Sequence, residues 1–179
     1  MIDDVILSKY SSLTLRHKPD FADVRPNSGG WVNLEQLVKG LKDVDVSVSS
    51  ERILDILASS DKKRFTLPPD GLYVRAAQGH SIDVDLALEP RRPPDILFHG
   101  TSVKAVETIL DVGLTPQTRR HVHLSTDMDI AHRVGSRHGK PVVLLVDAKE
   151  MHQDGYTFWQ ADNGVWLTDD VPTPYIRKT

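Results

Sequence analysis

The apolar residues of this sequence change their spacing partway along the chain. In the first part they recur at helical intervals, whereas in the second part they alternate with polar residues or form short apolar runs. Helical spacing buries one side of a helix, and alternation buries one face of a strand. The proline-rich residues 90–94 separate the two patterns and are typical of a linker. The sequence therefore predicts an α+β protein with two domains, residues 1–90 and residues 91–179.

Three helices are predicted in the first domain from signals at their ends. Pro19 ends the first helix, because the residue before a proline avoids helical geometry. Asn33 and Gln36 have capping-box spacing at the start of the second helix, and Ser49 or Ser50 caps the third.

A β-hairpin is predicted directly after these helices. Residues 64–67 and 72–76 form its strands, and Pro68-Pro69-Asp70-Gly71 forms its turn. Three helices followed by a hairpin are typical of a winged-helix domain.

The second domain is predicted to alternate short strands with helices. Gly113 ends its first helix as a left-handed cap, and Asp162-Asn163-Gly164 makes a tight turn. Strands are expected at residues 96–98, 121–125, 142–146, 156–159 and 165–167, and helices at residues 103–110 and 127–136.

The composition limits the functions open to this chain. Its 179 residues include no cysteine, which excludes disulfides, thiolate metal sites and a cysteine nucleophile. The net charge of −3 excludes nucleic-acid binding through bulk positive charge, so such binding requires a local basic site. No apolar run is long enough to cross a membrane and no signal peptide is evident, so we expect a cytoplasmic protein.

Basic residues beside structured segments are candidates for function. Arg16 and His17 close the first helix, where positive charge also complements the helix dipole. Arg64 begins the hairpin and either contacts phosphate or is solvated. Arg119 and Arg120 lie in a loop, where arginines are usually solvated but ligand contacts also concentrate. Converging guanidinium groups suit a doubly charged oxyanion such as phosphate.

His99-Gly100-Thr101 follows a buried-looking strand and precedes a helix. Its glycine permits close backbone approach and the helix N-terminus offers N–H groups to an anion, although an ordinary strand-to-helix turn is the alternative. His121 and His123 share a strand face, but no cysteine or paired carboxylate completes a ligand set, so we predict no metal site. The sequence has neither a P-loop nor a Rossmann glycine pattern.

Taken together, these motifs resemble the RNA 2′-phosphotransferase family, the NAD-dependent tRNA 2′-phosphotransferases. The resemblance covers nearly the whole chain, and motifs that are weak singly become specific when they occur in order. The motifs are Leu15-Arg16-His17-Lys18-Pro19, Gly30-Trp31-Val32, Lys63-Arg64-Phe65, Gln78-Gly79-His80-Ser81, His99-Gly100-Thr101, Arg119-Arg120-His121-Val122-His123-Leu124-Ser125 and Asn163-Gly164-Val165-Trp166-Leu167.

The resemblance implies a winged-helix lobe that binds RNA and an ADP-ribosyltransferase-like lobe that binds NAD. It implies that Arg16, His17, Arg64 and Arg119 are catalytic. In the implied reaction, an internal RNA 2′-phosphate attacks C1″ of the NAD ribose and expels nicotinamide, forming RNA-2′-phospho-ADP-ribose. The ribose O2″ then attacks the phosphorus, which gives 2′-OH RNA and ADP-ribose 1″,2″-cyclic phosphate.

NAD is thus expected as a consumed co-substrate and RNA with an internal 2′-phosphate as the partner. We expect a monomer that does not bind membranes. The resemblance assigns His99, Gly100 and Thr101 to the NAD ribose and nicotinamide. It assigns Leu114, His123 and Ser125 to other parts of the NAD cleft.

Two other classes of function compete with this one. A winged-helix regulator that senses a ligand is disfavoured, because the exposed face of the third helix is too acidic to enter a DNA groove. An ADP-ribosyltransferase acting on protein is disfavoured, because the usual catalytic glutamate has no counterpart: the second domain has only Glu107 and Glu150, and neither lies near a suitable turn. ADP-ribosylation of nucleic-acid termini remains open. The exposed face of the third helix comprises Glu51, Arg52, Asp55, Ser59 and Ser60.

Overall fold

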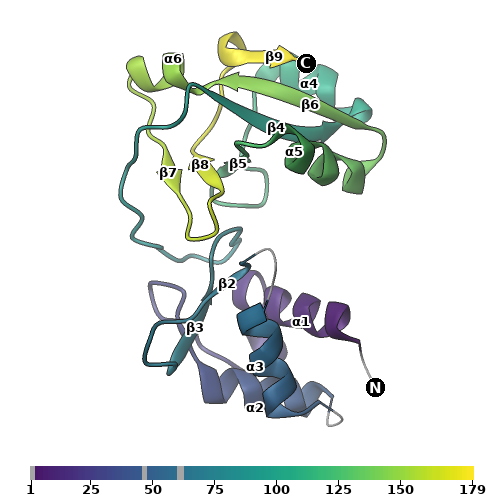
Figure 1. Cartoon of the computed structure of the whole chain (residues 1–179), viewed down its shortest axis with the longest axis vertical. Helices are drawn as coiled ribbons and strands as arrows, with labels where there is room; N and C mark the ends of the chain where they lie inside the picture. Colours follow the sequence, from purple (N-terminus) through teal and green to yellow (C-terminus); the bar gives the residue numbers. More distant parts are fainter. Residues whose placement is uncertain (1–2, 46–47, 60–62) are drawn as a thin grey trace. The chain divides into compact units, whose positions relative to one another are not determined.

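The computed structural model describes residues 3–45, 48–59 and 63–179. The chain divides into two compact units, Met1–Ala87 (unit 1) and Leu88–Thr179 (unit 2), each with a hydrophobic core (Figure 1). Both units combine helices with antiparallel strands, which confirms the predicted α+β class. No helix among the described residues is long and apolar enough to span a bilayer.

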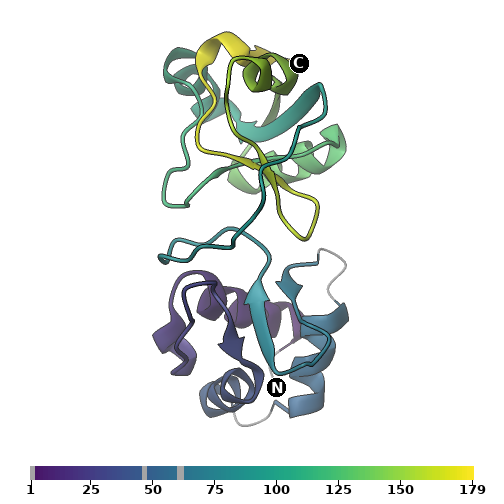
Figure 2. The same cartoon turned by 90° about the vertical axis from the view of Figure 1, so that its left-hand side faces the viewer.

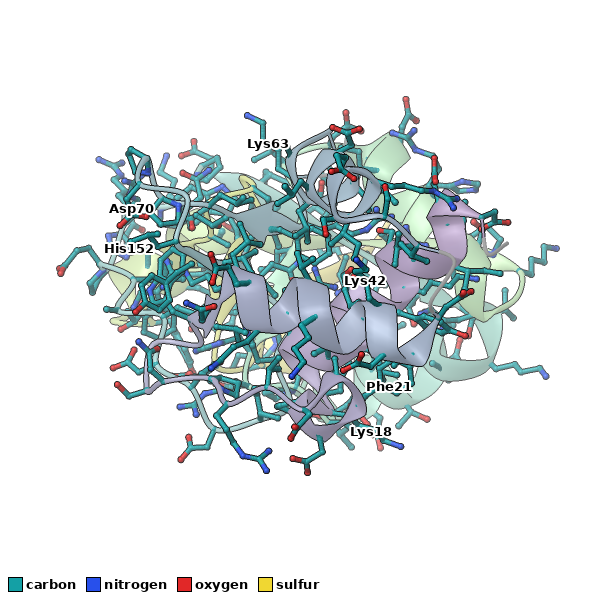
Figure 3. The ribbon with its side chains drawn as sticks, turned by 90° about the horizontal axis from the view of Figure 1, so that it is seen from below. Lys18, Phe21, Lys42, Lys63, Asp70 and His152 are labelled. Carbon is teal, nitrogen blue, oxygen red and sulfur yellow. The ribbon has the colours of Figure 1, made fainter. Side chains whose placement is uncertain are left out.

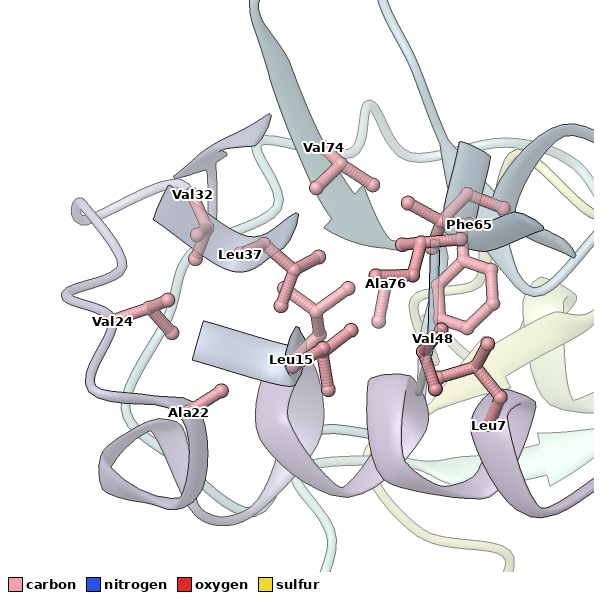
Figure 4. Packing of buried hydrophobic residues seen from close by; sticks show 13 residues of the cluster. Leu7, Leu15, Ala22, Val24, Val32, Leu37, Val48, Phe65, Val74 and Ala76 are labelled. Carbon is pink, nitrogen blue, oxygen red and sulfur yellow. The ribbon is translucent and has the colours of Figure 1, made fainter. Parts of the chain in front are cut away.

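Unit 1 packs three α-helices against a small antiparallel sheet with the strand order β1-β3-β2. Buried side chains from helices and strands meet in one core, which Figure 4 shows from close by. Leu15 is fully buried in this core and anchors the end of α1. The elements are α1 (Asp4–Arg16), η1 (Pro19–Ala22), β1 (Val32–Asn33), α2 (Leu34–Val44), α3 (Ser50–Ser59), β2 (Phe65–Thr66) and β3 (Tyr73–Ala76).

Side-chain caps begin the helices of unit 1 where the sequence predicts them. The Asn33 side chain accepts a hydrogen bond of 3.0 Å from the Gln36 N–H at the start of α2. The Ser49 hydroxyl accepts one of 3.2 Å from the Arg52 N–H, and α3 begins at Ser50. Both predicted caps are confirmed, because each satisfies an N–H that has no partner inside its helix.

The predicted hairpin forms between β2 and β3. Phe65 pairs with Ala76, and Thr66 pairs with Arg75, around a turn at residues 68–71. Phe65 and Ala76 are buried. Because side chains alternate along a strand, Thr66 and Arg75 lie on the opposite face.

Unit 2 contains two antiparallel sheets with the strand orders β4-β6-β9 and β5-β8-β7. Backbone hydrogen bonds of 2.8 and 2.9 Å between Phe98 and Ser125 connect the sheets. Figures 1 and 2 show α5 lying alongside β4. The elements are β4 (Ile96–Ser102), α4 (Val103–Val112), β5 (Val122–Leu124), α5 (Met128–Gly135), η2 (Ser136–His138), β6 (Pro141–Asp147), α6 (Ala148–Gln153), β7 (Trp159–Gln160), β8 (Trp166–Thr168), η3 (Thr173–Tyr175) and β9 (Ile176–Lys178).

The strand β4 is longer than the sequence predicts. It pairs with β6 over its whole length, so the predicted end at residue 98 is wrong. His99-Gly100-Thr101 lies inside the strand, and α4 starts only at Val103. Cross-strand bonds to β6 hold Gly100 extended, although glycine on its own weakens a strand.

Gly113 ends α4 with φ 89° and ψ 179°. The positive φ agrees with the prediction, but the extended ψ shows that the predicted left-handed helical cap is wrong. This extended geometry directs the chain into a bridge between Leu114 and Val171, which exchange hydrogen bonds of 2.8 and 2.9 Å.

Candidate active site

Residues 77–82 fold back onto the end of α1, where Arg16 and His17 lie. The backbone N–H groups of Ser81 and Ile82 donate to the carbonyl oxygen of Arg16, at 2.9 and 3.3 Å. The Nδ1 atom of His17 lies 2.9 Å from the Ser81 hydroxyl oxygen. The last carbonyls of a helix have no partner inside it, so this segment caps α1 and contacts both candidate residues at once.

Gly79 brings the backbone of this segment beside the Arg16 side chain. Its φ of +88° is a conformation that glycine adopts without strain. A Cβ added there would lie 3.8 Å from Cδ, Nε and Nη1 of Arg16. Arg16 is half-buried, so Gly79 forms part of the surface along which its guanidinium extends.

Arg64 contacts residues 77–82 at the opposite end from Ser81, through Ala77. Its carbonyl oxygen accepts a hydrogen bond of 2.9 Å from the Ala77 N–H, and its Nη1 donates to the Ser8 hydroxyl of α1 at 3.2 Å. Ala77 and Ser81 are separated by at most about 14 Å of extended chain. The structure therefore gathers Arg16, His17 and Arg64 around one short segment.

The basic residues before Arg64 differ from it in their surroundings. Lys63 is exposed and points away from the ribbon (Figure 3), whereas Arg64 is half-buried. Lys62, which precedes them in the sequence, lies outside the described residues. The hydrogen bond from Arg64 to Ser8 holds part of its side chain against α1.

In unit 2, His99 is fixed by the backbone of the neighbouring strand. Its Nδ1 lies 3.1 Å from the carbonyl oxygen of His123. A carbonyl oxygen only accepts, so Nδ1 carries the hydrogen. Burial, with smaller contributions from the charges of Arg119 and His138, lowers the pKa of His99, although the bond to His123 opposes this shift. His99 is therefore neutral near pH 7, and its Nε2 is a hydrogen-bond acceptor.

Arg119 lies in the loop before β5, where its N–H bonds to the carbonyl oxygen of Pro116 at 3.1 Å. Desolvation, and then the charge of Arg137, lowers the pKa of its guanidinium from its usual high value. Within the part of the chain that the structure describes, no hydrogen bond or ion pair engages this side chain. Arg119 therefore remains able to bind an anion.

Two further basic residues accompany His99 and Arg119. Arg137 and His138 lie on η2, which begins at Ser136 directly after Gly135. A Cβ on Gly135 would lie 2.5 Å from the Thr101 carbonyl oxygen, so η2 starts beside β4. Sequence reasoning missed this pair, although two basic residues between a helix and Gly139 were a visible signal.

The other predicted cofactor residues occupy different environments. A Cβ on Gly100 would lie 1.7 Å from the Ala131 carbonyl oxygen, so this glycine allows α5 to pack on β4. Thr101 is buried beside it, and Leu114, 4% exposed, is part of the core of unit 2. The Ser125 hydroxyl bonds to the backbone of Asp127, and His123 contributes the carbonyl oxygen that holds His99.

Two rival kinds of site find little support among the described residues. No group of three or more histidine, aspartate or glutamate side chains in residues 3–45, 48–59 and 63–179 could hold a metal ion. On α3, Arg52 forms an ion pair of 2.7 Å with Asp4 of α1. Arg52 is the one basic residue named on the predicted exposed face of this helix, and this ion pair already engages it within the protein. Ser60 of that predicted face lies outside the described residues.

Comparison with known proteins identifies relatives along nearly the whole chain. The sequence model of the family described as "RNA 2′-phosphotransferase, Tpt1 / KptA family" matches residues 3–170. The probable RNA 2′-phosphotransferase of Acaryochloris marina is 48% identical over 170 residues, covering 95% of this chain and 94% of that protein. That of Hahella chejuensis is 48% identical over 169 residues, with coverages of 94% and 91%. That of Nostoc punctiforme is 46% identical over 174 residues, with coverages of 97% and 96%.

Proposed function

The chain belongs to the RNA 2′-phosphotransferase family, and from this premise we propose that it transfers an internal RNA 2′-phosphate to NAD. NAD is consumed in the proposed reaction, which gives 2′-OH RNA, ADP-ribose 1″,2″-cyclic phosphate and nicotinamide. Family membership confirms the predicted class of enzyme, a transferase of RNA 2′-phosphate.

The gathering of Arg16, His17 and Arg64 around residues 77–82 is the observation that carries this proposal. A phosphate monoester has close to two negative charges at neutral pH, and arginine forks bind it through paired, charge-assisted bonds. The 2′-phosphate is already a nucleophile, so the first step requires orientation more than a base. We assign that orientation to these three residues.

The second step places extra negative charge on the oxygens around phosphorus. Donors already aimed at that charge lower the barrier, because they need no reorganisation during the reaction. Arg16, Arg64 and Arg119 supply such donors in this proposal. His17 passes a proton to the departing RNA 2′-oxygen, which leaves as a hydroxyl.

The chemistry of the donors in unit 2 fits NAD as the co-substrate. Neutral His99 offers Nε2 as an acceptor for a ribose hydroxyl, and Arg119 offers positive charge to a phosphate. NAD supplies the ribose carbon that receives the phosphate and the nicotinamide that leaves. The assignments of Gly100, Thr101, Leu114, His123 and Ser125 to this ligand remain part of the proposal, with Gly100 and Leu114 acting through packing.

We also propose that unit 1 is a winged-helix lobe for RNA and unit 2 an ADP-ribosyltransferase-like lobe for NAD. In support, unit 1 has three α-helices followed by the β2–β3 hairpin, and unit 2 has two connected antiparallel sheets. Exposed Lys63 stands next to that hairpin and is available to the RNA backbone.

Incubation with a short RNA that carries one internal 2′-phosphate tests this function. With NAD present, mass analysis should show RNA that has lost one phosphate, together with nicotinamide and the cyclic phosphate of ADP-ribose. Reactions without NAD, or with RNA that lacks the 2′-phosphate, should show no change. Phosphate removal without NAD, or label transfer from NAD onto protein without RNA, would contradict the proposal.

A further inference from the structure

The imidazole of His17 needs a support to keep one orientation. His17 is the residue after the last turn of α1, and its N–H still bonds to the Leu13 carbonyl oxygen at 3.0 Å. Its backbone is therefore fixed, but its side chain is exposed. The hydroxyl oxygen of Ser81, 2.9 Å from Nδ1, gives the ring a defined direction.

Ser81 is itself held in place by the helix that carries His17. Its N–H donates to the Arg16 carbonyl oxygen at 2.9 Å, and the next N–H, from Ile82, reaches the same oxygen at 3.3 Å. Ser81 thus contacts Arg16, the last residue of α1, through its backbone, and His17, the next residue, through its side chain. The two backbone bonds to Arg16 fix the main chain at Ser81, so its hydroxyl lies at a defined place beside the ring.

We infer that Ser81 is a positioning residue for His17: its hydroxyl engages Nδ1 and so presents Nε2 to the RNA 2′-phosphate. This inference rests on the proposed role of His17. When His17 is protonated, both ring nitrogens donate, Nδ1 to the Ser81 oxygen and Nε2 to the substrate. A hydrogen bond to the charged form favours that form. Ser81 therefore sets the direction of the His17 ring, and we expect its hydroxyl to favour the protonated form.

The Ser81→Ala variant removes the hydroxyl but keeps the backbone bond to Arg16, so the end of α1 should stay folded. We expect kcat/KM for 2′-phosphorylated RNA to fall about tenfold or more, as for the loss of a hydrogen bond to a charged group. The alkaline limb of the pH profile should move to lower pH, because His17 loses its proton more easily. Ser81→Thr keeps a hydroxyl at the same position and should restore both quantities.

The titration of His17 gives a second readout that does not require turnover. The imidazole nitrogen signals of His17 can be assigned from their loss in His17→Gln and followed by NMR against pH. The midpoint should fall in Ser81→Ala and stay at its wild-type value in Ser81→Thr. Arg16, Lys18 and His80, the neighbouring charged or titratable residues on these two segments, are the same in every variant.

Ser28→Ala serves as the matched control, because Ser28 is an exposed serine of the same unit. The inference is overturned if Ser81→Ala keeps the wild-type titration of His17 and the wild-type pH profile. It is also overturned if Ser81→Thr loses as much activity as Ser81→Ala with no change in titration, since the effect would then be steric. If the wild-type protein releases no phosphate from RNA, the proposed function fails, while the titration still tests the contact between Ser81 and His17.

Discussion

His99 donates a hydrogen bond from Nδ1 to the backbone oxygen of His123, over 3.1 Å, and burial holds the pKa of this histidine below its usual value. The unfolded chain protonates His99 near pH 6.5, whereas the folded chain does so at lower pH. Between these values the unfolded state binds the extra proton, so stability should fall as pH decreases below about 6.5. Urea unfolding at several pH values should show this loss, and His99→Asn should reduce it.

His152 on α6 provides the comparison, because it is exposed. His152→Asn should keep the pH dependence of the wild-type protein. An equal dependence in wild type and His99→Asn would show that His99 is not the neutral group described here.

Gly100→Ala should destabilise unit 2 strongly. The added Cβ would lie 1.7 Å from the carbonyl oxygen of Ala131, and this neighbour is backbone that cannot rotate away. Overpacking of this kind costs about 3 kcal/mol or somewhat more in the free energy of unfolding. Denaturant unfolding measures the loss directly.

Gly29→Ala is the matched control for this substitution. Its nearest contact would be Cδ1 of the Trp31 side chain at 3.1 Å, and a side chain can shift. We expect a clearly smaller loss than at Gly100. Similar losses at both positions would mean that α5 does not depend on Gly100 for its packing on β4.

The elements that the sequence predicted well depend on nearby residues. Asn33 and Ser49 bond to N–H groups three residues ahead, and the β2–β3 hairpin closes through a four-residue turn. In each case the determining contacts are local, with the most distant pair, Phe65 and Ala76, 11 positions apart, so a local pattern contains the information.

The elements that are poorly predicted from the sequence depend on pairing with distant strands. β4 continues through Gly100 because β6, more than forty positions along the chain, supplies its partners. No pattern in the sequence predicts β9, a short strand with exposed Arg177 and Lys178 that is defined by its pairing with β6. Short polar edge strands have no apolar alternation, so their position follows from the sheet they join.

The candidate site also combines residues that a local pattern indicates with a grouping that only distant contacts produce. The sequence singles out Arg16, His17 and Arg64 in separate motifs, and the family resemblance implies that they act together. Their grouping depends on residues 77–82, which contact the end of α1 from more than sixty positions away. No local pattern encodes such a contact, and their catalytic roles, like that of Arg119, stay predictions.

Arg64→Ala should lower kcat/KM for 2′-phosphorylated RNA by about a hundredfold to a thousandfold, as expected for one donor to a developing anion. Arg64→Lys should not recover this loss, because an ammonium lacks the planar fork. Ser8→Ala should have a smaller effect, since it removes only the bond that steadies the Arg64 side chain. Steady-state kinetics on the three variants measures how far each substitution lowers kcat/KM.

Arg92→Ala controls for the loss of one positive charge, because Arg92 is exposed on the segment that precedes β4. Its kinetics should match those of the wild-type protein, and the melting temperature of Arg64→Ala should confirm that the variant is folded. Wild-type turnover by folded Arg64→Ala would remove Arg64 from the proposed site.

Binding of NAD should stabilise the protein against unfolding. A ligand at about one hundred times its Kd that binds only the folded state adds about 2.7 kcal/mol, which raises the melting temperature. Arg119→Ala should weaken this shift, because it removes a guanidinium that no other residue among those described engages. His99→Asn should also weaken it, since the substitution removes the acceptor at Nε2, whereas Arg92→Ala should leave it unchanged. If Arg119→Ala and His99→Asn both keep the wild-type rise in melting temperature, NAD binds elsewhere in the molecule. If saturating NAD does not raise the melting temperature of the wild-type protein, NAD is not the co-substrate.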